Sequence, residues 1–356
     1  MRPKCTVISF LLCDAFARVF IAVFWCGLLV ASHAQTNYQR LKSFGSPELS
    51  GIDPVSPLVK GGDGTFYGTT FAGGTKEAGT AFKLNPDGSG YVVLRHFTGN
   101  DGDGSGPVAL VEGSDGALYG TTEHGGTGLC SGETIFKLNK NGSGYAVLRS
   151  FDGCGDAIAH PPLSVMQGSD GALYGTTSTG GVPGGTNSIG AVFRLNPDGS
   201  GYTVLHLFTN INDGYDPEEL TQGSDWALYG TAWSGGSNSA GTIFKLNRDG
   251  SAFTVLHSFT GSGGAGSFPS AGLLEGSDAA LYGTTRNGGS DGLGTVFRLN
   301  KDGKGFAVLR SFPAHSLDAN ATDEFPVAGL VEGSDGALYG TTGRGAGHNV
   351  GERRSS

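Results

Sequence analysis

Copies of the ten-residue segment GSDGALYGTT recur along the whole chain. They occur at 113–122, 168–177 and 333–342, with looser copies at 61–70, 223–231 and 276–285. Successive tyrosines of this motif are 52 to 57 residues apart, at positions 67, 119, 174, 229, 282 and 339. Self-similarity at a nearly fixed period of this length is typical of folds built from repeated units that pack on one another.

Each unit contains four short apolar runs. A second motif follows each of the first five copies, as in GTVFRLNKDGKGFAVLRSF at 294–312. Apolar runs separated by Asp-Gly turns indicate strands joined by tight hairpins, and we find no helical periodicity beyond residue 34. Four-stranded units of roughly 50 residues match the period of β-propellers. We therefore predict an all-β fold, a β-propeller of about six four-stranded blades, with an open β-solenoid as the alternative.

The two ends of the chain complement each other. Residues 38–44, YQRLKSF, match the fourth strand of a unit, whereas the last copy supplies only its first two strands, through Thr342. We expect 38–44 to pair in the blade that contains Tyr339, so that the last blade is a composite of N- and C-terminal strands. That blade has no third strand in sequence. We therefore predict an incomplete blade with an unpaired edge and a disordered or aberrant tail at 344–356.

The first 34 residues differ in composition from the rest. Arg2 and Lys4 precede the apolar run 19–31, and Ser32-His33-Ala34 follows it. This pattern is typical of a secretory signal cleaved after Ala34, and the run is shorter than the roughly 20 residues that span a bilayer. We expect residues 1–34 to be a signal peptide and 35–343 to be the propeller domain. The mature protein would be secreted, at the cell surface or periplasmic, without a membrane span.

Two cysteines remain after signal removal. Cys130 and Cys154 lie symmetrically about residue 142, at the turn between the third and fourth strands of the second unit. An even pair in an exported protein predicts one disulfide between them. The chain has 23 Lys+Arg against 32 Asp+Glu, a net charge of −9, which argues against nucleic acid as a partner. We expect a monomer.

The consensus unit GSDGALYGTT…GG…GTVFKLNPDGSGYTVLHSF resembles the GloVer tandem repeat of exported bacterial surface proteins. The resemblance covers nearly all of residues 38–343. It implies export to the cell surface. It implies no activity, and no catalytic residue comes with it.

One loop has the spacing of a calcium-binding loop. Within 101–112, oxygen-bearing side chains fall at positions 1, 3, 5 and 12, namely Asp101, Asp103, Ser105 and Glu112. The last of these recurs with the repeat, so the repeat already explains its position, and no helices flank the loop. We expect no cofactor, and the alternative is a Ca²⁺ site at Asp101, Asp103 and Ser105.

The residues that do not repeat are more informative about function. Directly after the Thr pair the units differ, and five of these side chains are Phe71, Glu123, His124, Trp233 and Arg286. They would lie at the edge of the ring that carries the loops of variable length, where we expect every non-repeated aromatic. An aromatic with charged neighbours suits stacking on a sugar or anchoring a protein. These five are the candidate ligand-binding residues, and ordinary loop variation is the alternative.

The sequence thus predicts an exported propeller that acts as a binding or surface-interaction module for a carbohydrate or protein ligand, rather than an enzyme. The alternative is an exported lyase or hydrolase of polysaccharides. It would use carboxylates of the variable loops, such as Glu123, Asp213 and Asp216. A third hypothesis is that the chain is a structural protein of the cell envelope.

Overall fold

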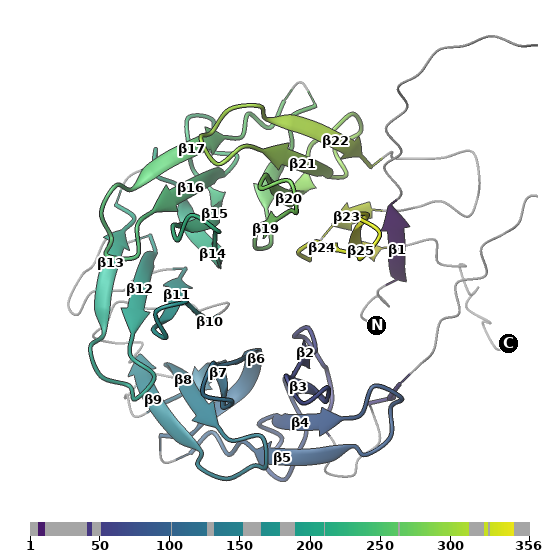
Figure 1. Cartoon of the computed structure of the whole chain (residues 1–356), viewed down its shortest axis with the longest axis vertical. Helices are drawn as coiled ribbons and strands as arrows, with labels where there is room; N and C mark the ends of the chain where they lie inside the picture. The colour runs from purple at the N-terminus through teal and green to yellow at the C-terminus, as the bar shows by residue number, and fades with distance from the viewer. Residues whose placement is uncertain are drawn as a thin grey trace, which may run out of the picture.

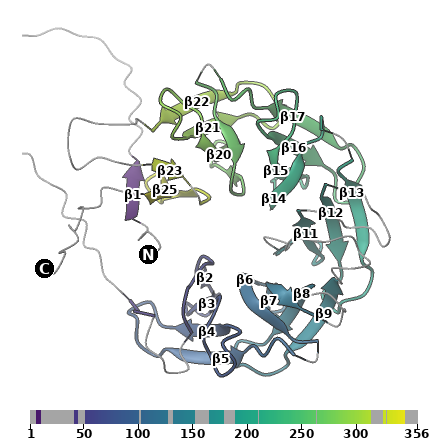
Figure 2. The same ribbon diagram turned by 180° about the vertical axis from the view of Figure 1, so that it is seen from behind.

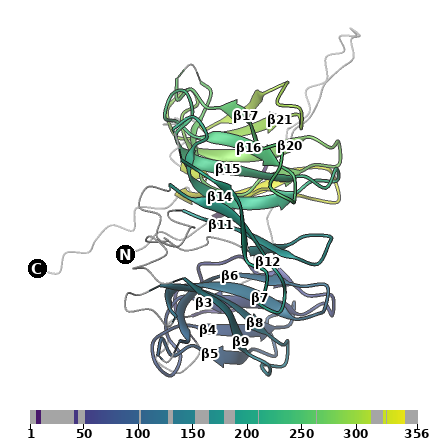
Figure 3. The same ribbon diagram turned by 90° about the vertical axis from the view of Figure 1, so that its left-hand side faces the viewer.

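Six antiparallel sheets stand around a common axis in the computed structural model of the chain (Figure 1). Figure 2 shows the ring from behind and Figure 3 from its side. The structure describes residues 6–10, 41–44, 51–100, 102–126, 132–151, 165–178, 189–209, 211–262, 264–312, 324–326 and 328–344. No helix in these ranges is long and apolar enough to cross a membrane. The predicted all-β propeller with about six blades is confirmed.

In the first five blades the strands run in sequence order from the axis to the rim. The first blade has β2 (Val59–Lys60), β3 (Phe66–Thr70), β4 (Thr80–Leu84) and β5 (Val92–His96). The second has β6 (Gly104–Glu112), β7 (Leu118–Gly125), β8 (Glu133–Leu138) and β9 (Ala146–Phe151). The third has β10 (Val165–Gln167), β11 (Leu173–Thr177), β12 (Ala191–Leu195) and β13 (Thr203–Leu207).

The fourth blade has β14 (Tyr215–Gln222), β15 (Leu228–Ser234), β16 (Thr242–Leu246) and β17 (Thr254–Ser258). In the fifth the inner strand is split into β18 (Ser267–Pro269) and β19 (Leu274–Glu275), before β20 (Leu281–Asn287), β21 (Thr295–Leu299) and β22 (Ala307–Ser311). The sixth has β23 (Glu324–Pro326), β24 (Val331–Glu332), β25 (Leu338–Arg344) and β1 (Thr6–Phe10).

The core lies between neighbouring blades. The second and third strands are apolar on both faces, and such strands must be covered on both sides. At the first junction, Phe136 and Leu138 of the second blade pack against Tyr67 and Phe97 of the first. Burial of side chains of this size contributes roughly 1.5–3 kcal/mol each, so stacking of the blades stabilises the ring.

The repeated decamer is scaffold. The Tyr119 hydroxyl donates a hydrogen bond to Asp115 Oδ2 at 2.8 Å, and Lys137 Nζ of the third strand lies 2.7 Å from the same oxygen. The Tyr–Asp bond recurs in every blade, at Tyr67, Tyr174, Tyr229, Tyr282 and Tyr339. The motif therefore fixes a turn to the strand beside it.

A second repeated contact joins neighbouring blades at their turns. The Glu112 carboxylate accepts a hydrogen bond from the Gly62 amide of the preceding blade at 2.8 Å. Equivalent bonds run between the later blades, with Gln167, Gln222, Glu275 and Glu332 as acceptors. Lys60 stands at this position in the first blade, and an ammonium group cannot accept. Figure 1 shows a wider gap between the sixth sheet and the first than between other neighbours.

Residues 41–44 lie against the first blade in the place of a preceding blade's outer strand. Phe44 is 5.3 Å from Phe82 and 6.0 Å from Tyr91 between ring centroids. Phe97 meets the second blade in the same way, at 5.1 Å from Phe136 and 5.9 Å from Tyr145. This placement agrees with a composite last blade. Residues 38–40 lie outside the described part of the chain, and pairing of 38–44 with the sixth sheet stays a prediction.

The sixth blade corrects one expectation. Strand β1 pairs antiparallel with β25, Thr6 opposite Thr342. In the first blade, Thr80 of the third strand stands opposite Thr70 in the same way. In the full-length chain the edge of β25 is therefore paired, contrary to the expectation of an unpaired edge, because residues assigned to the signal occupy it. The segment TVISF has the apolar, β-branched pattern of a third strand such as TVFRL. The tail beyond residue 344 lies outside the described residues.

Candidate functional site

The two edges of the ring carry different connections. We call the edge with the short hairpins, such as 61–65 and 85–91, the turn face. The edge with the connections from second to third strands and from one blade to the next is the loop face. Loops held by a rigid scaffold are where binding residues concentrate, and the five candidate ligand-binding residues end strands or begin loops on the loop face.

Phe71 and His124 meet across the junction of the first and second blades. Their ring centroids are 6.4 Å apart, with the planes inclined by 72°. Phe71 also lies over Gly106, where an added Cβ would come within 2.8 Å of the ring and the backbone has φ of +62°. A cavity of about 310 Å³ opens beside these rings, lined also by Lys76, Glu77 and Ser105. The structure thus brings two of the predicted residues together at a pocket.

Trp233 and Arg286 meet in the same way between the fourth and fifth blades. The Arg286 guanidinium carbon is 5.7 Å from the Trp233 ring centroid. Phe268, which precedes a proline as Gly106 does, lies 5.4 Å from the indole at 31°. Trp233 is half-buried and Arg286 is exposed. Since Trp233 and Phe71 occupy equivalent positions in the fourth and first blades, the two aromatic groups lie half a ring apart (Figure 1).

Glu123, the fifth predicted residue, has a neighbour that the sequence analysis missed. Glu133 is only 3% exposed, and its Oε2 has no hydrogen-bond partner. Burial, with a smaller contribution from the Glu123 carboxylate, raises the pKa of Glu133 to about 9. Alignment of the units could have found it, because the other four complete blades have glycine there, at Gly79, Gly190, Gly241 and Gly294.

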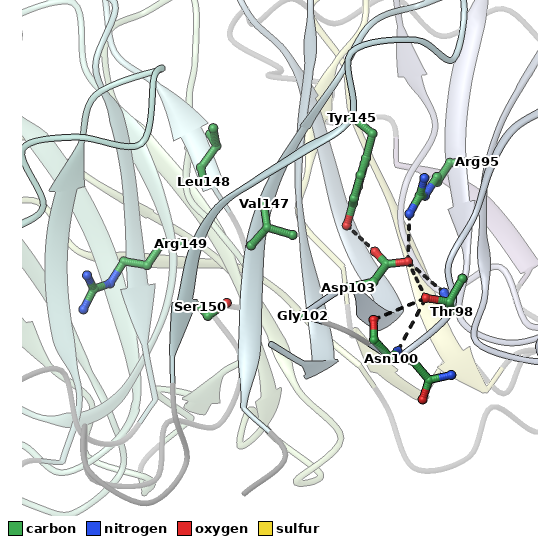
Figure 4. A pocket seen from close by; sticks show the side chains of 10 residues that line it. All are labelled: Arg95, Thr98, Asn100, Gly102, Asp103, Tyr145, Val147, Leu148, Arg149 and Ser150. Atoms are coloured by element: carbon green, nitrogen blue, oxygen red, sulfur yellow. Dashed lines mark hydrogen bonds and ion pairs between the residues drawn. The ribbon is translucent and has the colours of Figure 1, made fainter. Parts of the chain in front are cut away.

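A groove of about 760 Å³ lies between the outer strands of the first two blades (Figure 4). At one end the Asp103 carboxylate accepts hydrogen bonds from Tyr145 Oη at 2.5 Å and from Arg95 Nη2 at 2.8 Å. It also accepts from the Thr98 amide and hydroxyl, at 2.9 and 2.8 Å. Burial raises the pKa of Asp103, but these hydrogen bonds outweigh it and hold the pKa below its usual value. The Arg149 side chain points away from this cluster.

The residues that have the spacing of a calcium-binding loop do not form a loop in the structure. Asp103 directly precedes β6 and Glu112 ends it, and nine residues of strand span roughly 30 Å. The Asp103 carboxylate already accepts four hydrogen bonds, and Ser105 faces the loop-face cavity. Asp101 lies outside the described residues. Among the residues that are described, no cluster of His, Cys, Asp and Glu could hold a metal ion.

The carboxylates of the enzymatic alternative are dispersed. Asp213 Oδ2 lies 3.9 Å from His206 Nε2 at the rim, whereas Asp216 belongs to the inner strand β14 with φ of +56°. Two residues further on, sequence reasoning missed Glu218. Burial, and then the Glu219 and Asp216 carboxylates, raise the pKa of Glu218 to about 8. Cys130 and Cys154 lie outside the described residues, so their disulfide stays a prediction.

One non-repeated aromatic lies on the opposite face, contrary to expectation. Trp226 is in the turn between β14 and β15 and is 58% exposed. The sequence showed it in the motif copy GSDWALYGT, where four other copies have glycine and one has alanine. The expectation that all distinctive aromatics lie on the loop face is therefore wrong.

Comparisons with known proteins agree with the repeat. A family profile described as Gloeobacter/Verrucomicrobia repeat matches residues 26–185 and 161–352. No curated protein matches the chain. The extracellular domain of a protein described as a hybrid two-component system from B. thetaiotaomicron aligns with TM-score 0.52 at 11% identity, covering 81% of this chain and 32% of that one.

Two further structures are similar at lower scores. TolB from Acinetobacter baumannii aligns with TM-score 0.44 at 15% identity, over 76% of this chain and 61% of that one. A nidogen/laminin complex aligns with TM-score 0.46 at 14% identity, over 73% and 81%. At these identities, likeness to solved structures concerns the fold alone. The two profile matches together cover most of the chain, which therefore belongs to the Gloeobacter/Verrucomicrobia repeat family.

Proposed function

We propose that the protein is a propeller-shaped binding module whose loop face binds a glycan. The observation that carries the proposal is the assembly of Trp233 with Phe268 and Arg286 from the neighbouring blade. Aromatic rings and arginine are the side chains most enriched at the centres of binding sites. A partly exposed indole flanked by an exposed guanidinium offers a stacking surface and hydrogen-bond donors to one sugar unit.

The second aromatic group supports an extended ligand. Phe71 and His124 border a cavity of about 310 Å³, which is at the lower end of the roughly 300–1,000 Å³ of small-molecule sites. It is suited to one sugar unit. Because the two groups lie on the same face, a polymer could reach both, and the second contact would then form at a high effective concentration.

Loss of the indole is expected to weaken this binding roughly tenfold without unfolding the ring. The test is the affinity of Trp233→Ala for oligosaccharides of xylan, galactan, mannan and chitin, measured by calorimetry beside the parent protein. Lys304→Gln, an exposed change on the turn face, serves as the control. Unchanged affinity of Trp233→Ala, or no binding of any of the four sugars by the parent, would count against the proposal.

A hydrolase is the second candidate, and Glu218 is the observation that favours it. Its raised pKa makes it a proton donor at neutral pH, and pairs of carboxyl groups with separated pKa values perform glycoside hydrolysis. If the protein is a hydrolase, incubation with the same oligosaccharides produces new reducing ends. Glu218→Gln then abolishes this production while binding of the oligosaccharides persists. A parent protein that binds without release leaves the module as a binder.

We further propose that residues 1–34 direct export. Cleavage after Ala34 removes β1, so the mature protein would lose the third strand of its sixth blade. N-terminal sequencing of the exported protein is expected to give a sequence that begins at Gln35. We propose separately that Cys130 and Cys154 form a disulfide, so thiol titration of the exported protein is expected to find neither of them free. An exported chain that retains Thr6–Phe10, or that has two reactive thiols, contradicts the respective part of this proposal.

A further inference from the structure

Trp226 is held in a backbone conformation that a bulky residue disfavours. Its φ is +66°, in the left-handed region that glycine adopts without steric cost. The equivalent turns of the other blades have φ between +61° and +80° and carry Gly64, Gly116, Gly171, Ala279 and Gly336. All these turns close in the same way, and the Trp226 amide donates to the Gly223 carbonyl at 2.9 Å. The turn therefore has no structural need for tryptophan.

The Trp226 side chain also contributes little to the core. It is 58% exposed, whereas the tyrosine three residues later, Tyr229, is fully buried. Backbone strain in a folded protein points to a function when nothing in the packing explains it. An exposed indole at a strained position is best explained by a contact with something outside the chain.

An arginine with unused donors lies beside the indole. The Arg248 guanidinium carbon is 5.8 Å from the Trp226 ring centroid. Arg248 Nη1 lies 3.3 Å from Ser169 Oγ and 3.7 Å from Asp170 Oδ2. At the equivalent positions Lys140 and Lys301 form close ion pairs with Glu112 and Glu275. The fourth blade has Gln222 in place of that glutamate, so the guanidinium keeps most of its five N–H donors for another acceptor.

A cavity lies beside Arg248. It has a volume of about 360 Å³ and is lined by Arg248, Arg194, Tyr174, Thr203, Leu205 and two aspartates. Of the aspartates, Asp170 lies between the two arginines, and the carboxylate of Asp249 is held in its own turn by the Ser251 amide and hydroxyl at 2.9 and 2.6 Å. The guanidinium groups are thus the donors available to a ligand, beside an apolar ring.

We propose that Trp226, Arg248 and the adjoining cavity form a second ligand site, on the turn face, for a uronic acid unit of an acidic glycan. The sugar ring stacks on the indole, and its carboxylate accepts paired hydrogen bonds from the guanidinium, the geometry for which arginine is suited. The site shares no residue with the loop-face groups. It goes beyond the proposed function and does not depend on it.

The test uses oligogalacturonate and its methyl ester in a Phe71→Ala/Trp233→Ala background, in which both aromatic groups of the loop face are removed, so that binding reports on the turn face. Binding of oligogalacturonate is expected, with at least tenfold weaker binding of the ester, because esterification removes the carboxylate charge and leaves the ring. Trp226→Gly should weaken binding of oligogalacturonate about tenfold. The same change should raise the melting temperature by about 2–4 °C, because glycine relieves the turn. The rise shows that the loss does not come from unfolding.

Arg248→Gln separates stacking from charge, and poly-glutamate separates a glycan from an acidic peptide. Arg248→Gln is expected to bind the acid and the ester equally weakly, whereas Lys304→Gln, an exposed cation in a turn of the fifth blade, changes neither. Three results would overturn the proposal: no binding of oligogalacturonate, equal binding by Trp226→Gly, or poly-glutamate binding as tightly as oligogalacturonate. Failure of the loop-face proposal affects none of these measurements.

Discussion

Replacement of Asp103 by alanine is expected to lower the free energy of unfolding by about 3 kcal/mol, the largest effect of any single change proposed for this protein. The carboxylate is 8% exposed and accepts hydrogen bonds from Arg95, Thr98 and Tyr145. These groups come from two blades and the loop between them. Alanine removes all four hydrogen bonds and leaves the donors without an acceptor, and the guanidinium without its counter-charge.

Urea titration at pH 7 measures this loss, and Asp87→Ala is the matched control. Asp87 accepts two hydrogen bonds from Ser89 within one exposed turn, so its replacement should lower the free energy of unfolding far less than that of Asp103. Because the folded pKa of Asp103 is lowered, its contribution is present above the unfolded pKa and is lost as the pH falls through the folded pKa. The difference between parent and Asp103→Ala should therefore shrink in acid. Equal effects of the two substitutions at pH 7 would show that the inter-blade cluster has no special role.

Glu133→Gln is expected to have the opposite sign and to stabilise the protein by about 2 kcal/mol at pH 7. Folding raises the pKa of Glu133 from 4.5 to about 9, so between these values the folded protein binds a proton that the unfolded chain has lost. Stability is then lost as the pH rises through this window. Glutamine is neutral at every pH and removes that penalty, although its amide is still buried.

The pH series is the decisive readout for this change. At pH 4 glutamate is protonated in both states, and the parent and Glu133→Gln should unfold at similar urea concentrations. The difference should grow steadily to pH 8. Ser237→Ala, a change at an exposed position on the same face that has no titratable group, should show no such trend. A constant difference between parent and Glu133→Gln across the series would mean that Glu133 is not buried as a neutral acid.

The architecture could be predicted because every unit contains the same sequence signals for strands and turns. The Asp-Gly turns, the period near 50 residues and the apolar strands recur, so errors in reading one unit are corrected by the others. The same register predicted that Trp233 and Arg286 would come from neighbouring blades, and the structure brings them together. The positions of candidate residues on one face followed from counting strands.

The features that could not be predicted lie at positions where one unit differs from the repeat. Strand β1 was missed because the N-terminal residues matched a signal peptide. The apolar pattern of a strand was therefore interpreted as part of that signal. Trp226 and Glu133 both replace glycine of the repeat, and the strain or burial that results is visible only in three dimensions. The Glu133 side chain is buried, with Oε2 lacking a hydrogen-bond partner, and the Trp226 indole is exposed.

Hydrogen–deuterium exchange with and without bound oligosaccharide tests most directly whether the loop face is the binding face. With the xylan, galactan, mannan or chitin oligosaccharide of highest affinity, slower exchange is expected in residues 71–78 and 233–240, next to Phe71 and Trp233. Turns of the fifth blade, at 276–280 and 301–305, should exchange at unchanged rates. Protection confined to those turns, or none in either loop at saturating sugar, would contradict the account.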